Sequence, residues 1–427
     1  MTSPNDLQNR AASVEVVTIG DELLLGFTID TNAAHLAREL SAIGMHIVRR
    51  TTVGDDAAHI VQAVGEALDR TGAVITTGGL GPTSDDLTKE SIARLFGRGM
   101  HLDENHLAWM EERWRKRFNR PLPETNRQQA MIPDGAVKLK NNHGSAPGIW
   151  LEDDRGRWVA MLPGVPREMR GMLADTLLPR LASRARVDTV VRSLTLRTTG
   201  VAESLLADQI ESTGARPVGP SLAYLPSIAG VDLRLTVRDV PPDVAESTLL
   251  AAAERLRQCV GASIYGEGTD DLAAIVLQMC RDRHLTIGVA ESCTGGLLGA
   301  RLTAVPGSSD VVLGGVIAYA NGVKHDVLGV REESLLGHGA VSEEVVREMA
   351  TGARRVAGSD IGLGITGIAG PTGATPDKPV GTVWIAVDIR GEVKARLLHL
   401  WGDREEIRER SAQWTLELVR QELGARS

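Results

Sequence analysis

The sequence has 427 residues, of which 42% are hydrophobic, 24% are charged and 3% are aromatic, and its formal net charge is −8. This composition is typical of a soluble globular chain, and at about 150 residues per domain the length predicts about three domains. The negative charge and the scarce aromatic residues argue against a general basic or stacking surface, so we expect no direct nucleic-acid or membrane partner.

The cysteines and the apolar segments indicate the compartment. Cys259, Cys280 and Cys293 form no Cys-x-x-Cys pair, which argues against a disulfide framework or a cysteine zinc site. The N-terminal residues carry no signal-peptide pattern, and the apolar stretch 311–320 is too short and too rich in glycine to span a bilayer. We therefore expect a cytoplasmic protein.

Residues 14–96 alternate between strand and helix patterns. This order is typical of a parallel sheet covered by helices on both faces, in which ligands bind at the loops that follow the strands. The loops "GDELLLG" and "GGLGPTSDD" both follow predicted strands. The predicted elements are strands at 14–20, 45–54 and 73–79 and helices at 30–44 and 55–72.

The rest of the chain predicts two further domains. Residues 179–268 show an α+β pattern without a GxxG loop or a net basic face, which we interpret as a linking or dimerisation domain and not an RNA-binding module. Its expected elements are strands at 189–200, 221–226, 231–239 and 263–266 and helices at 201–213 and 243–261. Residues 269–427 return to α/β order, with strands at 285–290, 311–320, 361–367, 381–389 and 394–401 and helices at 270–284, at 342–357 (with Ser342 as N-cap) and at the C-terminus.

The segment "TTGGLGPTSDDLTKE" predicts a phosphate and metal site between a strand and a helix. Glycines let backbone N–H groups approach an anion closely, and carboxylates next to phosphate donors favour a bridging divalent metal ion. The alternative is that Ser84 or Asp85 only caps the helix. The candidate residues are Gly78, Gly79, Gly81, Thr83, Ser84, Asp85 and Asp86, joined at the same sheet edge by Asp21, Glu22 and Asp55.

These N-terminal motifs resemble a known fold. "GDELLLGFTIDTNAAHLARELSAIG" and "TTGGLGPTSDDLTKE" are similar to the MoaB/MogA-type molybdopterin-binding fold, and "NNHGSAPG" and "MLPGVPREM" resemble the N-terminal domain of the competence/damage-inducible CinA family. The resemblance implies a three-layer α/β domain over residues 1–178 that hydrolyses ADP-ribose to AMP and ribose 5-phosphate with Mg, Mn or Co, and with potassium as a further candidate ion. By motif, Gly79, Gly81 and Thr83 would hold phosphate, and Asp85 and Asp86, with Asp21 as a further candidate, would lie on the metal side.

The stretch "GVAESCTGGLLGARL" places Ser292, Cys293 and Thr294 between a predicted strand and a helix. A nucleophile at such a junction points outward and lies in the positive field of the helix N-terminus. Cys293 is the alternative nucleophile. No histidine follows it at a recognisable spacing, and a small cysteine at this position more often packs than reacts.

Candidate partners for Ser292 follow other strands. "AYANGVKHD" offers Tyr319, Asn321 and Lys324 after an apolar strand that we expect to be buried. Burial would lower the lysine pKa, so that a neutral amine can accept the serine proton. "GITGIAGPTG" adds Thr366 and Gly367 as oxyanion or phosphate donors.

Simpler interpretations stay open for these residues. His325 and His338 are other candidate bases. Ser292 alone could be a helix cap, Lys324 a solvated helix residue and Thr366 a turn former. Three such polar loops, each after a strand of one small domain, favour a site.

The C-terminal motifs are similar, in order and over nearly the whole of residues 269–427, to the CinA C-terminal domain; they are "AESCTGG", "GGVIAYANGVKHDVLGV", "HGAVSEEVVREMA", "TGIAGPTG", "KPVGTVWIA" and "GDREEIRERS". The resemblance implies deamidation of nicotinamide mononucleotide to nicotinate mononucleotide and ammonia, without a cofactor. It implies Ser292 as nucleophile, Lys324 as base, and Tyr319 and Thr366 as active-site hydroxyls. The substrate-binding candidates are Thr294, Gly295, Gly296, Asn321, Gly367 and Arg408, the last preferred to Arg404.

The same resemblance implies a KH-like linking domain over residues 179–268 and a homodimer with nucleotides as small-molecule partners. Two other functions stay open. A molybdopterin-binding or adenylylating protein is argued from the N-terminal fold, because one fold can host several functions. A non-enzymatic interaction protein in competence or the damage response is suggested by the name of the family.

Overall fold

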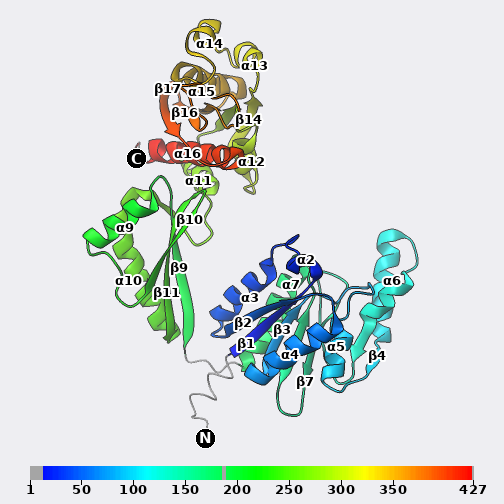
Figure 1. The fold of residues 1–427 in the computed structure, drawn as a ribbon. Helices are drawn as coiled ribbons and strands as arrows, with labels where there is room; N and C mark the ends of the chain where they lie inside the picture. The colour runs from blue at the N-terminus through cyan, green and yellow to red at the C-terminus, as the bar shows by residue number, and fades with distance from the viewer. Residues whose placement is uncertain (1–12, 185–188, 426–427) are drawn as a thin grey trace. The chain divides into compact units, whose positions relative to one another are not determined.

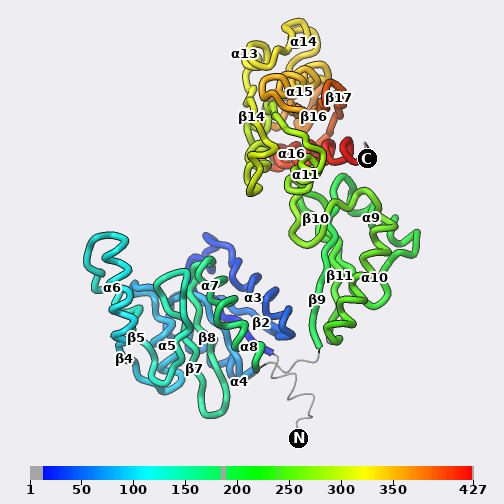
Figure 2. Tube along the Cα trace, turned by 180° about the vertical axis from the view of Figure 1, so that it is seen from behind, coloured from blue at the N-terminus to red at the C-terminus, as the bar shows by residue number. Residues whose placement is uncertain are grey.

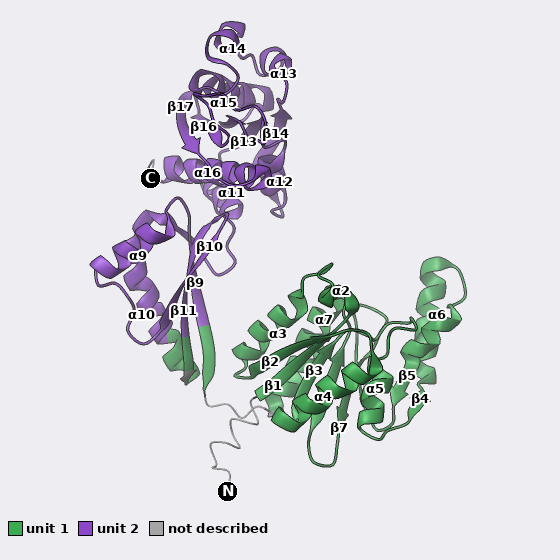
Figure 3. Cartoon of the chain, viewed as in Figure 1, with its two compact units in different colours: residues 1–192, 237–246 green, residues 193–236, 247–427 purple. Residues whose placement is uncertain are grey.

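The protein is described here by a computed structural model that covers residues 13–184 and 189–425. The chain divides into two compact units (Figure 3), one of residues 1–192 and 237–246 and the other of residues 193–236 and 247–427. Within the covered ranges, no helix combines the length and the apolar character that crossing a bilayer requires. The predicted boundaries at 178/179 and 268/269 stay predictions.

The predicted parallel sheet of the first unit is present and continues in antiparallel strands that the sequence pattern did not indicate. The strand order is β2-β1-β3-β8-β7-β6; the β1–β2, β1–β3 and β3–β8 pairs are parallel, and β7–β8 and β6–β7 are antiparallel. The strands are β1 (Ser13–Ile19), β2 (His46–Val53), β3 (Ala73–Thr77), β6 (Val137–Leu139), β7 (Gly148–Glu152) and β8 (Trp158–Leu162), with a separate pair of β4 (Met100–Leu102) and β5 (Met131–Pro133).

Helices cover both faces of this sheet, as expected for a three-layer fold (Figure 1 and Figure 2). Alternate residues of β1 point to opposite faces, so Val16 packs in one core cluster with Leu36 of α3, and Val17 packs in another with Ile60 of α4. The helices are α2 (Asp21–Leu24), α3 (Thr31–Ala42), α4 (Ala57–Thr71), α5 (Thr88–Leu95), α6 (Glu104–Phe118), α7 (Pro166–Met172) and α8 (Leu178–Arg184), with the short η1 (Glu124–Ala130) and the π-helical η2 (Leu173–Leu177).

The α+β segment forms a four-stranded sheet of order β10-β11-β9-β12, and its helices follow the predicted order. Leu206 and Ile210 of α9 and Leu233 and Leu235 of β11 are fully buried, which indicates that this sheet has a hydrophobic core. The elements are β9 (Val190–Thr198), α9 (Glu203–Ser212), β10 (Ser221–Ser227), β11 (Gly230–Val240), α10 (Pro242–Val260), η3 (Gly261–Ser263) and β12 (Ile264–Glu267).

The C-terminal sheet has the order β14-β13-β15-β16-β17, with β14, β13 and β15 parallel and the other pairs antiparallel. Its strands are β13 (Ile287–Glu291), β14 (Val312–Ile317), β15 (Ile361–Gly367), β16 (Thr382–Ile389) and β17 (Glu392–His399). Its helices are α11 (Leu272–Asp282), α12 (Leu297–Thr303), η4 (Ser308–Asp310), α13 (Asn321–Asp326), α14 (Glu332–His338), α15 (Glu343–Ala357) and α16 (Arg404–Gly424).

Helices pack on both faces of this sheet. Ile287 of β13 shares one core cluster with residues of α11, α12 and α16, and α15 packs on the other face. A Cβ on Gly362 would lie 2.0 Å from the Ala350 carbonyl oxygen, so only glycine lets α15 approach β15 this closely. Ser342 caps α15 as predicted, because its side chain accepts the Val345 N–H.

One expectation about this sheet is wrong. The apolar strand before Lys324 is not buried: β14 is an edge strand, and Leu313 and Ile317 are 47% and 57% exposed. An apolar run records hydrophobicity, whereas its burial depends on which elements pair with and cover the strand. Lys324 itself is 1% exposed, so its burial does not come from a buried preceding strand.

Candidate functional site

Ser292 and Lys324, the predicted nucleophile and base, lie in contact. The Lys324 Nζ is 3.2 Å from the Ser292 Oγ. Ser292 directly follows β13, and Lys324 lies on α13 after β14. Because β13 and β14 are adjacent parallel strands, the loops that follow them open at the same sheet edge.

The amine of Lys324 is held in a dry, uncharged setting. The side chain is 1% exposed, and its Nζ donates to the carbonyl oxygens of Ala318 (2.8 Å) and Tyr319 (3.3 Å). Burial lowers the lysine pKa, and the nearby Cys293 opposes this in part. In residues 13–184 and 189–425, no carboxylate forms an ion pair with this amine. A neutral amine has two N–H groups for the two carbonyls, which leaves its lone pair for the Ser292 hydroxyl.

Glu291, which the sequence analysis did not single out, organises the turn after Ser292. It is 1% exposed, and its carboxylate accepts the N–H groups of Gly296 (3.0 Å), Leu298 (3.1 Å) and Gly299 (2.8 Å). The positive end of α12, expected to act on the nucleophile, is therefore already paired with a carboxylate. A charged residue at the end of an otherwise apolar strand was the signal that could have revealed this role.

Within the described chain, the turn itself leaves two backbone N–H groups without a partner, on the buried residues that directly follow Ser292. Gly295 and Gly296 adopt φ values of 60° and 99°, which glycine reaches without strain. The Ser292 N–H donates to the Ile365 carbonyl at 3.0 Å. The N–H groups of Cys293 and Thr294 have no acceptor in the part of the chain that the structure describes. Such a pair next to a nucleophile can stabilise an oxyanion.

Cys293 is buried, and burial raises the pKa of its thiol to about 12. The thiolate, which is the reactive form, is therefore scarce at neutral pH.

The two histidines that were candidate bases have other partners. The His325 Nδ1 lies 2.9 Å from the Val330 carbonyl oxygen, and the His338 Nδ1 lies 3.5 Å from a Glu344 carboxylate oxygen. Lys324 is thus the base that the geometry favours.

Two arginines of α16 border the same site. Arg408 donates to the Thr294 carbonyl oxygen at 2.8 Å and so holds the backbone of the nucleophile turn. Arg404 donates to the hydroxyl oxygen of Tyr319 at 3.0 Å and to the Gly370 carbonyl oxygen at 2.6 Å. Tyr319 is 61% exposed. Arg404 therefore lies at the open rim with this tyrosine, whereas Arg408 supports the turn.

The other predicted C-terminal residues differ in accessibility. Thr366 is 1% exposed and donates to the Ala340 carbonyl oxygen at 2.7 Å, so its hydroxyl oxygen can only accept from a substrate. Thr294 is fully buried, and its Oγ1 has no hydrogen-bond partner in the described chain. Asn321 is exposed at the first residue of α13, and Gly367 is partly exposed at the end of β15.

In the first unit, Asp86 shapes its own loop. Its carboxylate accepts the Gly81 N–H at 2.7 Å, the Thr83 N–H at 2.8 Å and the Thr83 hydroxyl at 2.5 Å. Two of the predicted phosphate-binding residues of this loop, Gly81 and Thr83, are therefore paired with Asp86, whereas Gly79 is not. Neither Ser84 nor Asp85 caps α5, because Leu87 is its N-cap and no side chain accepts there.

Carboxylates from three loops converge near this segment. The Asp21 N–H donates to the Asp55 carboxylate at 3.0 Å, and the Asp55 N–H donates to that of Asp21 at 3.3 Å. Burial and the negative charges of Asp21, Glu22 and Asp85 raise the pKa of Asp55. A divalent cation would relieve this repulsion, and carboxylates are the ligands such ions prefer. Within the described residues, no three Asp, Glu, His or Cys side chains are already grouped closely enough to hold a metal ion.

Lys89, another residue that the sequence analysis passed over, ties this region to η1. It is 3% exposed, and its Nζ donates to the carbonyl oxygens of Gln128 (2.6 Å), Gln129 (3.2 Å) and Met131 (3.1 Å). Burial lowers the pKa of Lys89 to about 8. With three main-chain acceptors, Lys89 serves to position η1 behind the glycine loop.

Comparison with known proteins places these sites in a family. The model described as "CinA C-terminal domain" matches residues 269–423, "Probable molybdopterin binding domain" matches 15–183, and "Damage-inducible protein CinA KH domain" matches 193–266. A CinA-like protein of Gemmatimonas aurantiaca is 63% identical over 408 residues, covering 95% of both chains. One of Kosmotoga olearia is 42% identical over 409 residues, covering 96% of this chain and 98% of its own. With matches of this length and identity, the chain belongs to the CinA family.

Proposed function

We propose that this protein hydrolyses two pyridine-nucleotide substrates. Its C-terminal domain deamidates nicotinamide mononucleotide to nicotinate mononucleotide and ammonia, and its N-terminal domain hydrolyses ADP-ribose to AMP and ribose 5-phosphate with a divalent metal ion. Both substrates are phosphorylated ribose compounds. The homodimer and the cytoplasmic location stay predictions.

The observation that carries the proposal is the contact between Lys324 and Ser292. A serine hydroxyl is a weak nucleophile unless an adjacent base takes its proton. Lys324 lies 3.2 Å from the Ser292 Oγ, is buried, and has a lowered pKa. This pair has the parts of an acyl-transfer site that needs no metal ion or histidine.

We propose the following steps for this pair. The Ser292 Oγ attacks the carboxamide carbon of the substrate while its proton passes to the Lys324 Nζ. The protonated amine then gives that proton to the departing nitrogen, so that ammonia leaves and an ester to Ser292 remains. Water attacks the ester with Lys324 again as the base, and the protonated amine returns a proton to the Ser292 Oγ. The carboxylate product leaves and the site is restored.

Other residues assist these steps. The N–H groups of Cys293 and Thr294 would stabilise the negative oxygen of each tetrahedral intermediate. Arg404 and Tyr319 at the rim suit the ribose phosphate, because a guanidinium forms strong charge-assisted hydrogen bonds with phosphate. Glu291 and Arg408 act as positioning residues, since they bind the backbone of the nucleophile turn and its helix.

The N-terminal domain would use Asp85 with Asp21 and Asp55 to hold the metal ion. Among the described residues the three carboxylates are not already grouped, so the ion would draw Asp85 toward Asp21 and Asp55, whose carboxylates and backbone N–H groups already bond each other. The bound ion would supply charge neutralisation at the pyrophosphate. Asp86 would keep the glycine loop in shape, and Lys89 would keep η1 in place.

Replacing the nucleophile should separate the two activities. Ser292→Ala should abolish ammonia release from nicotinamide mononucleotide and leave ADP-ribose cleavage unchanged, because the two sites lie on different domains. Ammonia can be measured by a coupled assay and AMP by chromatography. The matched control is Cys293→Ala, which keeps the backbone N–H groups and should retain most of the deamidation. The reverse pattern in the two variants would assign the nucleophile to Cys293.

The deamidation rate should depend on the ionisation of Lys324. Only the neutral amine can take the serine proton, so below its pKa the value of kcat/KM should fall about tenfold per pH unit. Because burial lowers the pKa of Lys324, the plateau should begin below the ordinary lysine value of about 10.4. Ammonia release measured from about pH 5 to pH 10 tests this, and a rate that does not change over that range contradicts the role of Lys324.

Changing the proposed metal-binding residues, or removing the metal ion, should affect ADP-ribose cleavage and not deamidation. Asp85→Ala or a chelator should reduce AMP formation from ADP-ribose by about a hundredfold, the order of effect seen when charge stabilisation at a transition state is lost. Ammonia release should not change. Glu104→Ala, an exposed acidic residue on α6, serves as the control. Full ADP-ribose cleavage by chelated wild-type protein would contradict the metal role.

Glu291→Gln should disturb the nucleophile turn, because an amide presents one acceptor oxygen and one NH₂ group to three N–H donors. We expect a loss of about 1–2 kcal/mol in the free energy of unfolding and a lower kcat for deamidation with little change in KM. Thermal melting and ammonia assays measure these effects. Asp30→Asn, the same change at the N-cap of α3, should leave deamidation unchanged. Unaltered kcat in Glu291→Gln would show that the cap does not position Ser292.

A further inference from the structure

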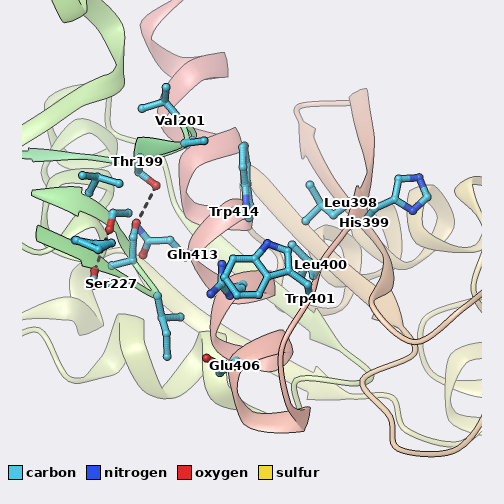
Figure 4. Close-up of a pocket in the computed structure, with 18 of the residues that line it drawn as sticks. Thr199, Val201, Ser227, Leu398, His399, Leu400, Trp401, Glu406, Gln413 and Trp414 are labelled. Carbon is cyan, nitrogen blue, oxygen red and sulfur yellow. Dashed lines mark hydrogen bonds between the residues drawn. The ribbon is translucent and has the colours of Figure 1, made fainter. Parts of the chain in front are cut away.

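A cavity of about 830 Å³ lies between the α+β sheet and the C-terminal domain, inside the second unit (Figure 4). One wall is formed by residues 199–203 and the hairpin turn 226–231, and the other by β17 and α16. None of the predicted site residues lines it. Its volume falls within the range of about 300–1,000 Å³ that is common for small-molecule sites.

Trp401 presents an aromatic face to this cavity. The side chain is 69% exposed, which is high for an indole in a chain with few aromatic residues. The Arg410 guanidinium covers one side of the ring, with its central carbon 4.0 Å from the ring centroid. With one face stacked on the guanidinium and most of the side chain exposed, the other face is open to a second planar group.

Arg410 keeps its charge available. Among residues 13–184 and 189–425, no carboxylate pairs with it and no acceptor bonds to it, and its buried Nε has no partner. Because no hydrogen-bond acceptor pairs with this guanidinium in the described residues, its charge can form charge-assisted hydrogen bonds with an anion in the cavity. Arg396, on the same side of the cavity, lies over the ring of Trp414 at 5.8 Å and donates to Gln421.

The opposite wall offers backbone donors. Val201, Ala202 and Glu203 line the cavity at the start of α9, and no side chain caps this helix. The free N–H groups of a helix N-terminus bind anions such as phosphate. The cavity also contains the carboxylates of Glu203 and Glu406, of which Glu406 accepts the Asp403 N–H in the capping box of α16.

The two walls are held together, so the cavity is formed in advance. The Gln413 Nε2 donates to the Thr199 Oγ1 at 3.2 Å and to the Ala229 carbonyl oxygen at 2.9 Å. Its Oε1 accepts from Arg301 at 2.8 Å, and its side chain is 3% exposed. Figure 4 shows Gln413 between Thr199 and the tryptophans. Binding would therefore not include a free-energy cost for closing the cavity.

We propose that this cavity binds a nucleoside monophosphate, with the base stacked on the open face of Trp401 and the phosphate held by Arg410 and the first turn of α9. An aromatic face, an unpaired guanidinium and free backbone donors match the three parts of such a molecule. The inference does not depend on the chemistry at Ser292 or on the carboxylates of the first unit.

The test is calorimetric titration of AMP into the full-length protein in the presence of a chelator. Wild-type protein should bind AMP, and Trp401→Leu and Arg410→Gln should each weaken one binding event by about tenfold or more, the order of effect for losing base stacking on an aromatic ring. The matched control is Trp109→Leu. Trp109 is also an exposed tryptophan under an arginine, with Arg113 5.2 Å from its ring, but it lies on α6. This control should bind AMP like the wild type.

Further titrations with adenosine and with inorganic phosphate test the contributions of the base and of the phosphate. Adenosine should bind more weakly than AMP and still depend on Trp401, and inorganic phosphate should compete only weakly. The proposal is overturned if the wild type binds no AMP at millimolar concentration, or if Trp401→Leu and Arg410→Gln bind AMP as tightly as Trp109→Leu. Tighter binding of a ten-nucleotide oligoadenylate than of AMP, with the same dependence on Trp401, would also overturn it in favour of an RNA ligand. Thermal melting of each variant tests whether it is folded. If Trp401→Leu does not fold, AMP binding by Arg410→Gln still tests the proposal.

Discussion

The C-terminal site depends on one buried amine. Lys324 is removed from water, has main-chain carbonyls as its other partners, and faces the hydroxyl of Ser292. Taking a lysine out of water without a carboxylate favours its neutral form, and that form is the one that can act as a base. The short helix α13 and the parallel pairing of β13 with β14 both serve to bring this amine to the strand end.

A second constraint acts on the nucleophile turn. Gly295 and Gly296 let the chain reverse, and Glu291 then fills the helix N-terminus that the reversal creates. The buried carboxylate is stabilised by three N–H donors, and these bonds connect the end of β13, next to Ser292, to the start of α12. Arg408 bonds the same turn from α16, so the turn that carries Ser292, the proposed nucleophile, has contacts on two sides.

The helix α16 connects the two sites of the second unit. Arg404 and Arg408 reach the residues around Ser292, whereas Arg410, Gln413 and Trp414 line the cavity that faces the α+β sheet. Arg404 and Arg408, four residues apart, share one face of the helix, and these three cavity residues follow within about two turns of Arg408. The α+β segment is thus more than a spacer, because Gln413 bonds it directly to the C-terminal domain.

The sequence by itself determined the alternation of strands and helices over residues 14–96, the helix cap Ser342, and the place of Ser292 and Lys324 in segments that follow strands of one domain. These features follow from periodicity and from the rule that loops after parallel strands meet at one edge. Only the tertiary structure decided the antiparallel strands β6 and β7, the exposed edge position of β14, the capping role of Glu291, the loop contacts of Asp86 and the cavity at Trp401. Each of these depends on which distant residues come into contact, and a local pattern of polar and apolar residues carries no record of such partners.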